Sequence, residues 1–295
     1  MTASADDSAL VPMIPGLSGI AGDYRALLCD VWGVVHNGIA AFPAACDALQ
    51  RYRRVHGGPV VFITNSPRPV EPTRQQLRRL GVPDDAYDGI VTAGDVTRTL
   101  IMERGVKKIT HIGPERDLPL YEGLGLTLVP ADQAEVAVCT GLYDDEVDKP
   151  EDYRAELTAL AARGLTMICA NADRIVERGH KKIFCAGAVA EFYETLGGTA
   201  IWLGKPLPEI YRATFAKLAE IGGRPFAPKD VLGIGDGLHT DIAGASAQGL
   251  DVLFITAGIH ASEFGAPETP DPVRVTEILD AHGISARAAM PFLAW

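Results

Sequence analysis

Hydrophobic residues along the chain alternate between short unbroken runs and longer stretches with helical spacing. The first run contains Leu27, Leu28 and Cys29 and ends at Asp30, a pattern typical of a strand buried on both faces. Residues 43–56 then show helical periodicity and stop at two glycines, as a helix does. PVVFITNS and DGIVTAG are further expected strands, and VEPTRQQLRRLGV and DVTRTLIMERG are expected helices. This alternation of strand and helix predicts an α/β fold with a parallel sheet and right-handed crossovers.

The alternation restarts near Lys107. Strands are expected in KKITHIG, LTLV, AEVAVCTG and TMICAN, and a helix in EDYRAELTALAARG. Because these strands exceed what one sheet requires, the pattern predicts an inserted domain at 106–200 within a discontinuous core domain of 1–105 and 201–295. After the insertion the first alternation of strand and helix resumes. Helices are expected in PLPEIYRATFAKLAEIGG and TDIAGASAQG, and strands in DVLGIGD and LDVLFITAG. The first 22 residues or so, small and polar with Pro and Gly, predict a loosely held lead-in.

Composition narrows the classes of partner. The 295 residues are 47% hydrophobic and 22% charged, and the net charge of −11 includes no basic block, which argues against nucleic acid or an anionic membrane as a partner. A small anionic substrate stays compatible, because a bound metal ion reverses the local field.

The cysteines and the N-terminus bear on the compartment. The five cysteines are an odd number and widely spaced, which predicts buried free thiols in a reducing compartment. The first basic residue is Arg25, so the N-terminus does not resemble a secretory signal. No apolar run approaches the ~20 residues that span a bilayer. These features together predict a soluble, cytoplasmic protein.

Polar residues stand at the ends of four expected strands or before the helices that follow. They are Asp30, the segment Thr64-Asn65-Ser66, the segment Gly204-Lys205-Pro206, and the pair Asp236 and Asp241. Each has an ordinary explanation alone, as a helix cap, a turn hydroxyl or a solvated lysine. Ligands of open parallel sheets bind where the carboxyl ends of the strands converge. The order of these residues therefore favours one shared site.

The residue types at these strand ends suit phosphate chemistry. The three aspartates offer hard oxygen ligands for Mg²⁺, while Lys205, Thr64 and nearby backbone N–H groups offer positive charge and donors for phosphate oxygens. A carboxylate beside a metal ion and a lysine can attack phosphorus. The product of that attack is an aspartyl-phosphate.

Four segments carry a resemblance to the haloacid dehalogenase (HAD) superfamily, subfamily IIA, which includes NagD-like and 4-nitrophenylphosphatase-like hydrolases. DVWGVVHNG, FITNS, GKPLPEIY and GDGLHTDIAGA match its four motifs in order, and the resemblance extends from about residue 24 to 258. The insertion lies between the second and third motifs, where this subfamily carries its cap. The resemblance implies a Rossmann-like parallel-sheet core with a large inserted α/β cap, a Mg²⁺-dependent phosphatase acting on a small phosphorylated molecule, and a homodimer formed through the cap.

The resemblance also implies residue roles. Asp30 is similar to the nucleophile, Thr64 and Asn65 to the residues that bind the transferred phosphoryl group, and Lys205 to the residue that neutralises both. The implied metal ligands are Asp30, the backbone carbonyl of Trp32, Asp236 and Asp241. In the cap, NADRIV resembles an Asn-Pro-Asp segment with Ala172 in place of proline, which makes Asn171 and Asp173 candidates for the substrate face; a plain turn fits the same sequence.

Trp32 is the departure from the family pattern. Phosphatases of this superfamily have Asp at this position, which protonates the leaving group and later activates water. Indole is only an N–H donor and does neither, and losing a general acid/base costs on the order of 10²–10⁴ in rate. This loss can be compensated in three ways. The substrate can have a good leaving group, His36 can act as the acid/base, or a residue of the cap can take that role.

Trp32 also keeps other functions open. True haloacid dehalogenases place an aromatic residue at this position, so metal-independent dehalogenation is one alternative, although those enzymes carry a different cap. A catalytically weak protein that binds a phosphorylated metabolite is another. A dinucleotide-binding fold is disfavoured because no GxGxxG follows the first strand.

Overall fold

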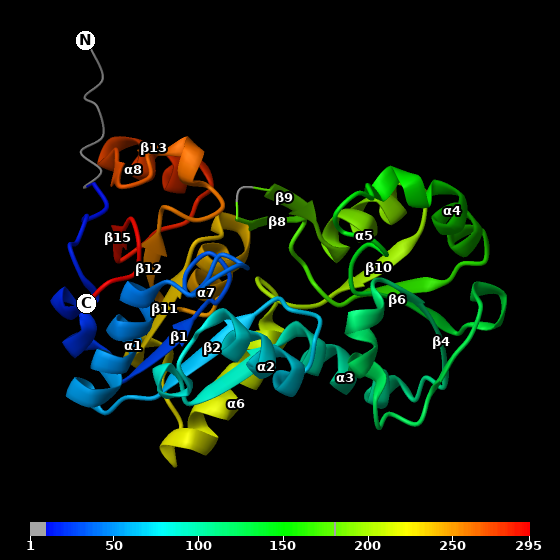
Figure 1. The fold of residues 1–295 in the computed structure, drawn as a ribbon, viewed down its shortest axis with the longest axis horizontal. Coiled ribbons are helices and arrows are strands. Elements are labelled where there is room, and N and C mark those ends of the chain that lie inside the picture. The colour runs from blue at the N-terminus through cyan, green and yellow to red at the C-terminus, as the bar shows by residue number, and fades with distance from the viewer. Residues whose placement is uncertain (1–9, 180) are drawn as a thin grey trace, which may run out of the picture.

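The computed structural model describes residues 10–179 and 181–295, which fold into two lobes, each built on a parallel sheet (Figure 1). The larger sheet has the order β15-β12-β11-β1-β2-β3, and every neighbouring pair is parallel. Its strands are β1 (Ala26–Cys29), β2 (Val60–Thr64), β3 (Gly89–Thr92), β11 (Val231–Gly235), β12 (Asp251–Ile255) and β15 (Ala288–Met290). This sheet and its helices form the core lobe.

Helices cover both faces of this sheet because its strands bury side chains on both sides. In β1, Ala26 and Leu28 point into one apolar cluster, whereas Leu27 and Cys29 point into the other. The second cluster is completed by α1 (Pro43–His56) and α2 (Val70–Leu80). The first is completed by α3 (Ala93–Arg104), α6 (Pro208–Gly222), α7 (Ala243–Ala247) and α8 (Pro272–Ala281). The arrangement is a doubly wound sheet with a covered core.

The second lobe, the cap, is a smaller α/β unit. Its sheet has the order β10-β7-β6-β4-β5 and is also parallel. The strands are β4 (Lys108–Ile112), β5 (Thr127–Leu128), β6 (Val136–Cys139), β7 (Thr166–Cys169) and β10 (Thr199–Trp202), and the helices are α4 (Arg154–Ala162) and α5 (Ala186–Thr195). An antiparallel hairpin of β8 (Ile175–Arg178) and β9 (Lys181–Phe184) lies at the junction of the lobes (Figure 1).

The predicted α/β fold class, a parallel-sheet core with an inserted α/β cap, is confirmed. All five cysteines are buried and free, as expected. The division of the chain at 106 and 200 stays a prediction, and the end of the cap sheet, Ile201 and Trp202 in β10, lies just beyond it. A two-stranded antiparallel pair, β13 (Gly265–Ala266) with β14 (Thr269–Pro270), also belongs to the C-terminal part.

The predicted loose lead-in is wrong for residues 10–22; the rest of it, residues 1–9, lies outside the described residues. Leu17 and Ala21 are fully buried in the apolar cluster that contains α1. The Leu17 N–H donates to the Ala294 carbonyl at 2.8 Å, and the Ile14 N–H donates to the Ala289 carbonyl at 2.9 Å. This segment is held because its few apolar residues pack against the C-terminal strand region, which local sequence does not reveal.

Within the described residues, no helix combines the length and the apolar composition needed to cross a bilayer. The cytoplasmic location stays a prediction, as does the homodimer.

Candidate active site

The candidate site lies where the order of strands in the core sheet reverses. From β1 the chain proceeds outward through β2 and β3, and after the cap it returns on the other side of β1 through β11 and β12. Asp30 follows β1 and Asp236 follows β11, and the Asp30 N–H donates to the Ile234 carbonyl at 2.8 Å. Ligands of open parallel sheets bind at this kind of crevice.

Three buried carboxylates converge there. One oxygen from each of Asp30, Asp236 and Asp241 lies within 4.8 Å of the others. Asp236 Oδ2 accepts from the Ile259 N–H at 2.9 Å, and Asp241 Oδ2 accepts from the Gly237 N–H at 3.1 Å. Asp241 is part of a π-helical turn, η8 (Leu238–Ile242), a geometry often found at functional sites.

Lys205 lies between two of these carboxylates. Its buried Nζ donates to Asp30 Oδ1, to Asp241 Oδ1 at 2.8 Å and to the Ile63 carbonyl at 3.3 Å. Burial alone would lower the pKa of Lys205, but Asp241 and Asp30 outweigh it and hold that pKa well above its usual range. The ammonium group is therefore charged at neutral pH.

The carboxylate cluster fits a divalent cation. Burial, and secondly the neighbouring Asp241, raise the pKa of Asp30 well above its ordinary value and raise the pKa of Asp236 to about 7. These shifts express the cost of crowding anions in a buried place, a cost that a cation of hard character removes. Gly33 (φ +87°) and Gly258 pack directly against the Asp236 side chain. A Cβ on either residue would lie within 2.3 Å of Asp236 Oδ2, so both positions require glycine.

Thr64 is the last residue of β2 and Asn65 follows it, on the side of β1 opposite to β11. Thr64 is buried, and its Oγ1 accepts from the Ser66 N–H at 3.2 Å. Asn65 holds three chain segments together: its Oδ1 accepts from the Lys205 N–H at 2.6 Å, and its Nδ2 donates to the Lys205 carbonyl at 3.2 Å and to Asp173 Oδ1 at 2.8 Å. The Asn65 side chain thus fixes the backbone of Lys205.

The two candidate cap residues have different positions. Asp173 reaches the core through its hydrogen bond to Asn65, and it lines the cavity that contains the three carboxylates. Asn171 Oδ1 accepts from the Asp173 N–H at 2.9 Å, so its side chain shapes the turn that presents Asp173. Asn171 lines a neighbouring cavity instead. The structure therefore brings Asp173 to the carboxylate site and places Asn171 beside it.

Trp32 lies at the entrance of this site and contacts the cap. Its Nε1 donates to the Glu177 carbonyl in β8 at 2.5 Å. The ring packs edge-on against His36, with ring centroids 5.0 Å apart. At the position where the family resemblance leads one to expect an acid/base, this chain therefore has a contact between core and cap.

His36 is a poor substitute acid. Its side chain is buried, and Nδ1 accepts from the Gly38 N–H at 3.0 Å. Burial lowers the pKa of His36 to about 4, so the imidazole is neutral at pH 7 and carries its proton on Nε2.

Two cavities meet at the site. One contains the carboxylates, Lys205, Asp173 and the hairpin residues Ile175 and Gly179. The other lies between core and cap. Trp32, Thr64, Asp173 and Val176 line both.

Sequence reasoning missed the three arginines of the second cavity. They are Arg68, Arg116 and Arg178. They are 48 and 62 residues apart along the chain (116 − 68 and 178 − 116) and form no basic block. The one available signal was the place of Arg68, three residues after Asn65 in the second motif.

Comparison with known proteins gives matches over most of the chain. Residues 27–127 match the family described as haloacid dehalogenase-like hydrolase, and residues 202–281 match a family described as HAD-hydrolase-like. A solved hydrolase of the haloacid dehalogenase-like family from Brucella suis 1330 is 45% identical, with a TM-score of 0.85, over 96% of this chain and 100% of the other.

Two named phosphatases are more distant. Ribonucleotide monophosphatase NagD from Escherichia coli K12 is 24% identical over 80% of this chain and 89% of its own, and its solved structure superposes with a TM-score of 0.67. A p-nitrophenyl phosphatase from Archaeoglobus fulgidus has 22% identity and a TM-score of 0.68, covering 90% of this chain and 95% of the other. At this identity the structural likeness establishes the shared fold.

Proposed function

The chain belongs to the haloacid dehalogenase-like hydrolase family, within its subfamily IIA, and we propose that it is a Mg²⁺-dependent phosphatase acting on a small phosphorylated metabolite through an aspartyl-phosphate on Asp30. Relatives named as phosphatases, NagD and the p-nitrophenyl phosphatase, support the reaction class.

The observation that carries the proposal is the position of Lys205 between two carboxylates. Lys205 Nζ contacts Asp30 and Asp241, while one oxygen of Asp236 lies within 4.8 Å of an oxygen on each. A structural ion pair needs only one carboxylate for one lysine. Two carboxylates on one ammonium, with a third carboxylate beside them at the ligand-binding edge of the sheet, suit a site that takes up a cation and a phosphoryl group.

In the proposed reaction, an Asp30 carboxylate oxygen attacks phosphorus, and the bond from phosphorus to the leaving-group oxygen breaks with its electron pair on that oxygen. Lys205 and the donors near Thr64 hold the phosphoryl oxygens. Water then attacks the aspartyl-phosphate at phosphorus, which releases phosphate and restores the Asp30 carboxylate.

Asp30, Asp236, Asp241 and the backbone carbonyl of Trp32 would hold Mg²⁺. The ion supplies charge neutralisation and Lewis acidity at the phosphoryl group when bound.

Trp32 restricts the substrates for which this reaction is fast. Neither indole nor the neutral, buried His36 has the properties of a general acid. A leaving group that departs as an anion of low basicity needs no proton, so we expect aryl and acyl phosphates to react faster than alkyl phosphates.

The test is hydrolysis of 4-nitrophenyl phosphate by the purified protein with and without Mg²⁺. The Asp30→Asn variant should lose at least about 10³-fold in kcat, the scale seen when a nucleophile is removed. Asp132→Asn, which changes an exposed aspartate of the cap, is the matched control and should behave as wild type.

Other outcomes favour other functions. Turnover that persists in Asp30→Asn contradicts the nucleophile, and release of chloride from a haloacid without metal would instead identify a dehalogenase. Tight binding of a phosphate ester without any turnover would identify a binding protein.

A further inference from the structure

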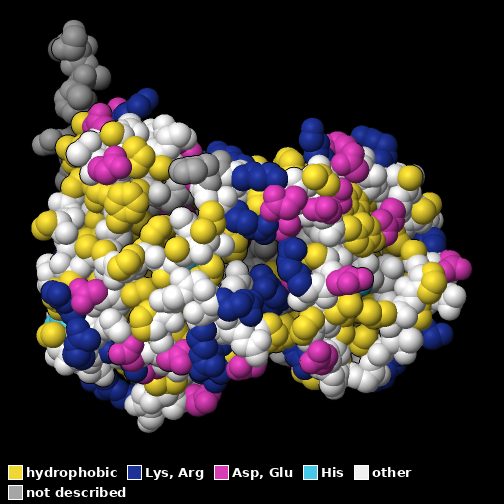
Figure 2. All heavy atoms as spheres, in the orientation of Figure 1, with side chains coloured by type: hydrophobic (Ala, Val, Ile, Leu, Met, Phe, Trp, Pro, Cys, Tyr) yellow, Lys and Arg dark blue, Asp and Glu magenta, His cyan; other side chains and the backbone are white. Residues whose placement is uncertain are grey.

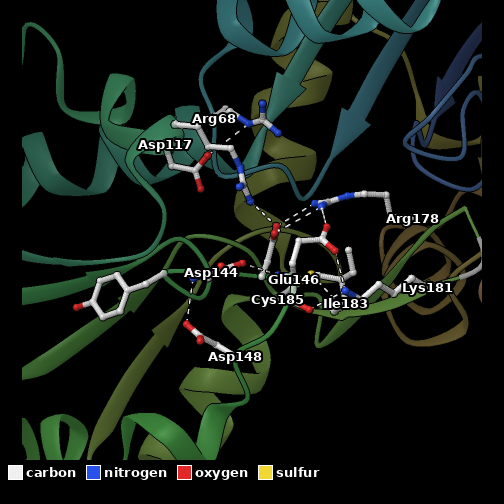
Figure 3. A network of polar contacts seen from close by, with 12 residues as sticks. Arg68, Asp117, Asp144, Glu146, Asp148, Arg178, Lys181, Ile183 and Cys185 are labelled. Carbon is white, nitrogen blue, oxygen red and sulfur yellow. Dashed lines mark hydrogen bonds and ion pairs between the residues drawn. The ribbon is translucent and has the colours of Figure 1, made fainter.

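Cationic side chains gather at the waist between the two lobes (Figure 2). The cavity at this waist is lined by Arg68, which precedes α2 in the core, by Arg116 of the cap segment η4 (Glu115–Tyr121), and by Arg178 at the end of β8. Figure 3 shows Arg68 and Arg178 directed toward one another across it, from the core and the cap. Three chain segments thus supply one guanidinium each.

Acidic partners hold two of these arginines in place. Arg178 Nη2 donates to Asp145 Oδ2 at 2.9 Å, its Nη1 donates to Glu146 Oε1 at 2.6 Å, and Arg116 Nη2 donates to the same oxygen of Asp145. Asp145 is therefore shared by two arginines. Glu146 is shared in turn, since Lys181 Nζ donates to its Oε2 at 2.7 Å.

Arg68 is less completely paired. Its Nε lies 3.4 Å from Asp117 Oδ1. Both atoms are buried and lack a hydrogen-bond partner among the residues that the structure describes. The two atoms face each other as an ion pair without hydrogen-bond geometry, so Asp117 holds Arg68 less firmly than Asp145 and Glu146 hold Arg178.

The lining of this cavity, the arginine cavity, is balanced in formal charge, with Arg68, Arg116 and Arg178 against Asp117, Asp145 and Asp173. Asp173 is bonded to Asn65 on the side of the carboxylate site, and Asp145 is shared by Arg116 and Arg178. Farther from the cavity acidic side chains are in excess, since Figure 3 also draws Asp144 and Asp148. Arg68, which lies 3.4 Å from Asp117, is therefore the cation of the lining that is most open to an added anion.

The arginine cavity and the cavity that contains the three carboxylates share part of their lining. Thr64 and Trp32 belong to both cavities. A phosphate ester whose phosphoryl group lies at Asp30 and Thr64 would direct its leaving group past Trp32 toward the arginine cavity. Apolar residues of that lining, among them Leu142, Ile183 and Phe184, would contact the body of the leaving group.

We propose that the arginine cavity binds a second anionic group, a carboxylate or a second phosphate, on the leaving group of the substrate. The substrate is then a small phosphate ester with an anion at its far end. The inference rests on the proposed function for where the phosphoryl group binds, but the anion site is measured separately by binding.

The test compares aryl phosphates whose leaving groups differ mainly in the charge at the far end, and aryl leaving groups depart without a general acid at Trp32. The carboxylate arm pairs 4-carboxyphenyl phosphate with 4-carbamoylphenyl phosphate. The phosphate arm pairs 1,4-phenylene bisphosphate with 4-methoxyphenyl phosphate. Binding to the Asp30→Asn variant is measured by calorimetry, which requires no turnover. The anionic member of at least one pair should bind about 10-fold or more tightly, the usual scale for a hydrogen bond to a charged group.

Variants locate the preference. In the Asp30→Asn background, Arg68→Gln and Arg178→Gln should abolish it, and Arg68→Lys should keep part of it because the charge remains while the planar fork is lost. Arg212→Gln is the matched control, because Arg212 is an exposed arginine on α6 paired with Glu209.

The outcomes are distinguishable. Equal binding of the charged and uncharged members in both pairs overturns the inference, even if wild-type protein hydrolyses 4-nitrophenyl phosphate. A preference that survives Arg68→Gln and Arg178→Gln overturns it as well. A preference that depends on these arginines, in a protein that hydrolyses none of the esters, supports the anion site and contradicts the phosphatase proposal. The arm with the larger preference distinguishes a carboxylate from a phosphate.

Discussion

At the scale of single residues, Asn65 shows how a short polar side chain organises the site. Its side-chain amide forms hydrogen bonds with the backbone N–H and carbonyl of Lys205 and with one carboxylate oxygen of Asp173. Asp173 belongs to the cap and Lys205 follows the cap in the chain, so one amide connects the phosphate side of the core to the cap and to the segment that returns from it. The sequence resemblance assigns Asn65 to phosphate binding; the geometry adds a structural task.

Asn65→Ala should lower the free energy of unfolding by about 1–3 kcal/mol, because it leaves the buried Lys205 N–H without an acceptor. Urea denaturation monitored by circular dichroism measures this loss. Asn37→Ala is the control: Asn37 Oδ1 accepts two backbone N–H groups in an exposed loop, where water replaces the lost oxygen. An equal loss in both variants would contradict the role given to Asn65.

At the scale of elements, the sequence pattern predicted helices and core strands better than the hairpin. Residues 43–56 were expected as a helix and form α1 with those bounds. The regular core strands are apolar and buried on both faces, so their pattern is local. β8 and β9 contain Glu177, Arg178 and two lysines, because they line cavities rather than a core. Their pairing depends on contacts with the core lobe that no local pattern carries.

The same limit applies to the candidate site. The residues that the motifs singled out at the strand ends do lie together, because the carboxyl ends of parallel strands meet at one edge. The arginines of the second cavity come from loops and a hairpin, and their meeting depends on how the cap lies on the core. Motif spacing contains no information on that arrangement.

The β8–β9 hairpin contacts the core through the loop after β1. Trp32 Nε1 donates to the Glu177 carbonyl, and the Gly179 N–H donates to the Asn37 carbonyl at 3.1 Å. Gly179 has a φ of +64°, in the left-handed region that favours glycine.

Trp32→Phe keeps an aromatic ring but removes the hydrogen bond to Glu177. The contact between the hairpin and the core should become weaker by about 1 kcal/mol. This free energy corresponds to roughly fivefold faster amide exchange in the hairpin, and we expect a similar rise in KM. Hydrogen–deuterium exchange and steady-state kinetics measure the two effects.

Trp202→Phe provides the control, since Trp202 donates to Glu194 within the cap. Unchanged hairpin exchange in Trp32→Phe would show that this hydrogen bond does not hold the hairpin.

At the scale of the whole molecule, metal binding should couple to stability and pH. The pKa of Asp236 in the folded protein is about 7, raised from an ordinary value of 3.8 by burial and by Asp241. A raised carboxylate pKa stabilises the fold fully below about pH 4, and that contribution is lost as pH rises through about 7. Mg²⁺ must displace the proton, so it binds better as pH rises.

The increase in Tm produced by excess Mg²⁺ should therefore grow between pH 4 and 7 and level off above. His36 and His111, whose pKa values are lowered to about 4 by burial, make stability rise with pH over part of this window, but they do so with and without metal. The difference in Tm between the two conditions removes their effect.

Differential scanning fluorimetry across pH measures this increment, and Asp236→Asn should reduce it while Asp132→Asn does not. An increment that is independent of pH would contradict the assignment of these carboxylates as metal ligands.

One apolar cluster continues from the core into the cap. Ile101 of α3 and Leu203 belong to the same cluster as Ile109 and Leu120 of the cap, whereas the hairpin reaches the core mainly by hydrogen bonds. In Figure 1, α3 and the hairpin lie at opposite ends of the junction. Separating the lobes at α3 would expose apolar surface at about 25 cal/mol per Å², while separation at the hairpin exchanges hydrogen bonds for water. Separation of the two lobes therefore costs less free energy at the hairpin than at α3.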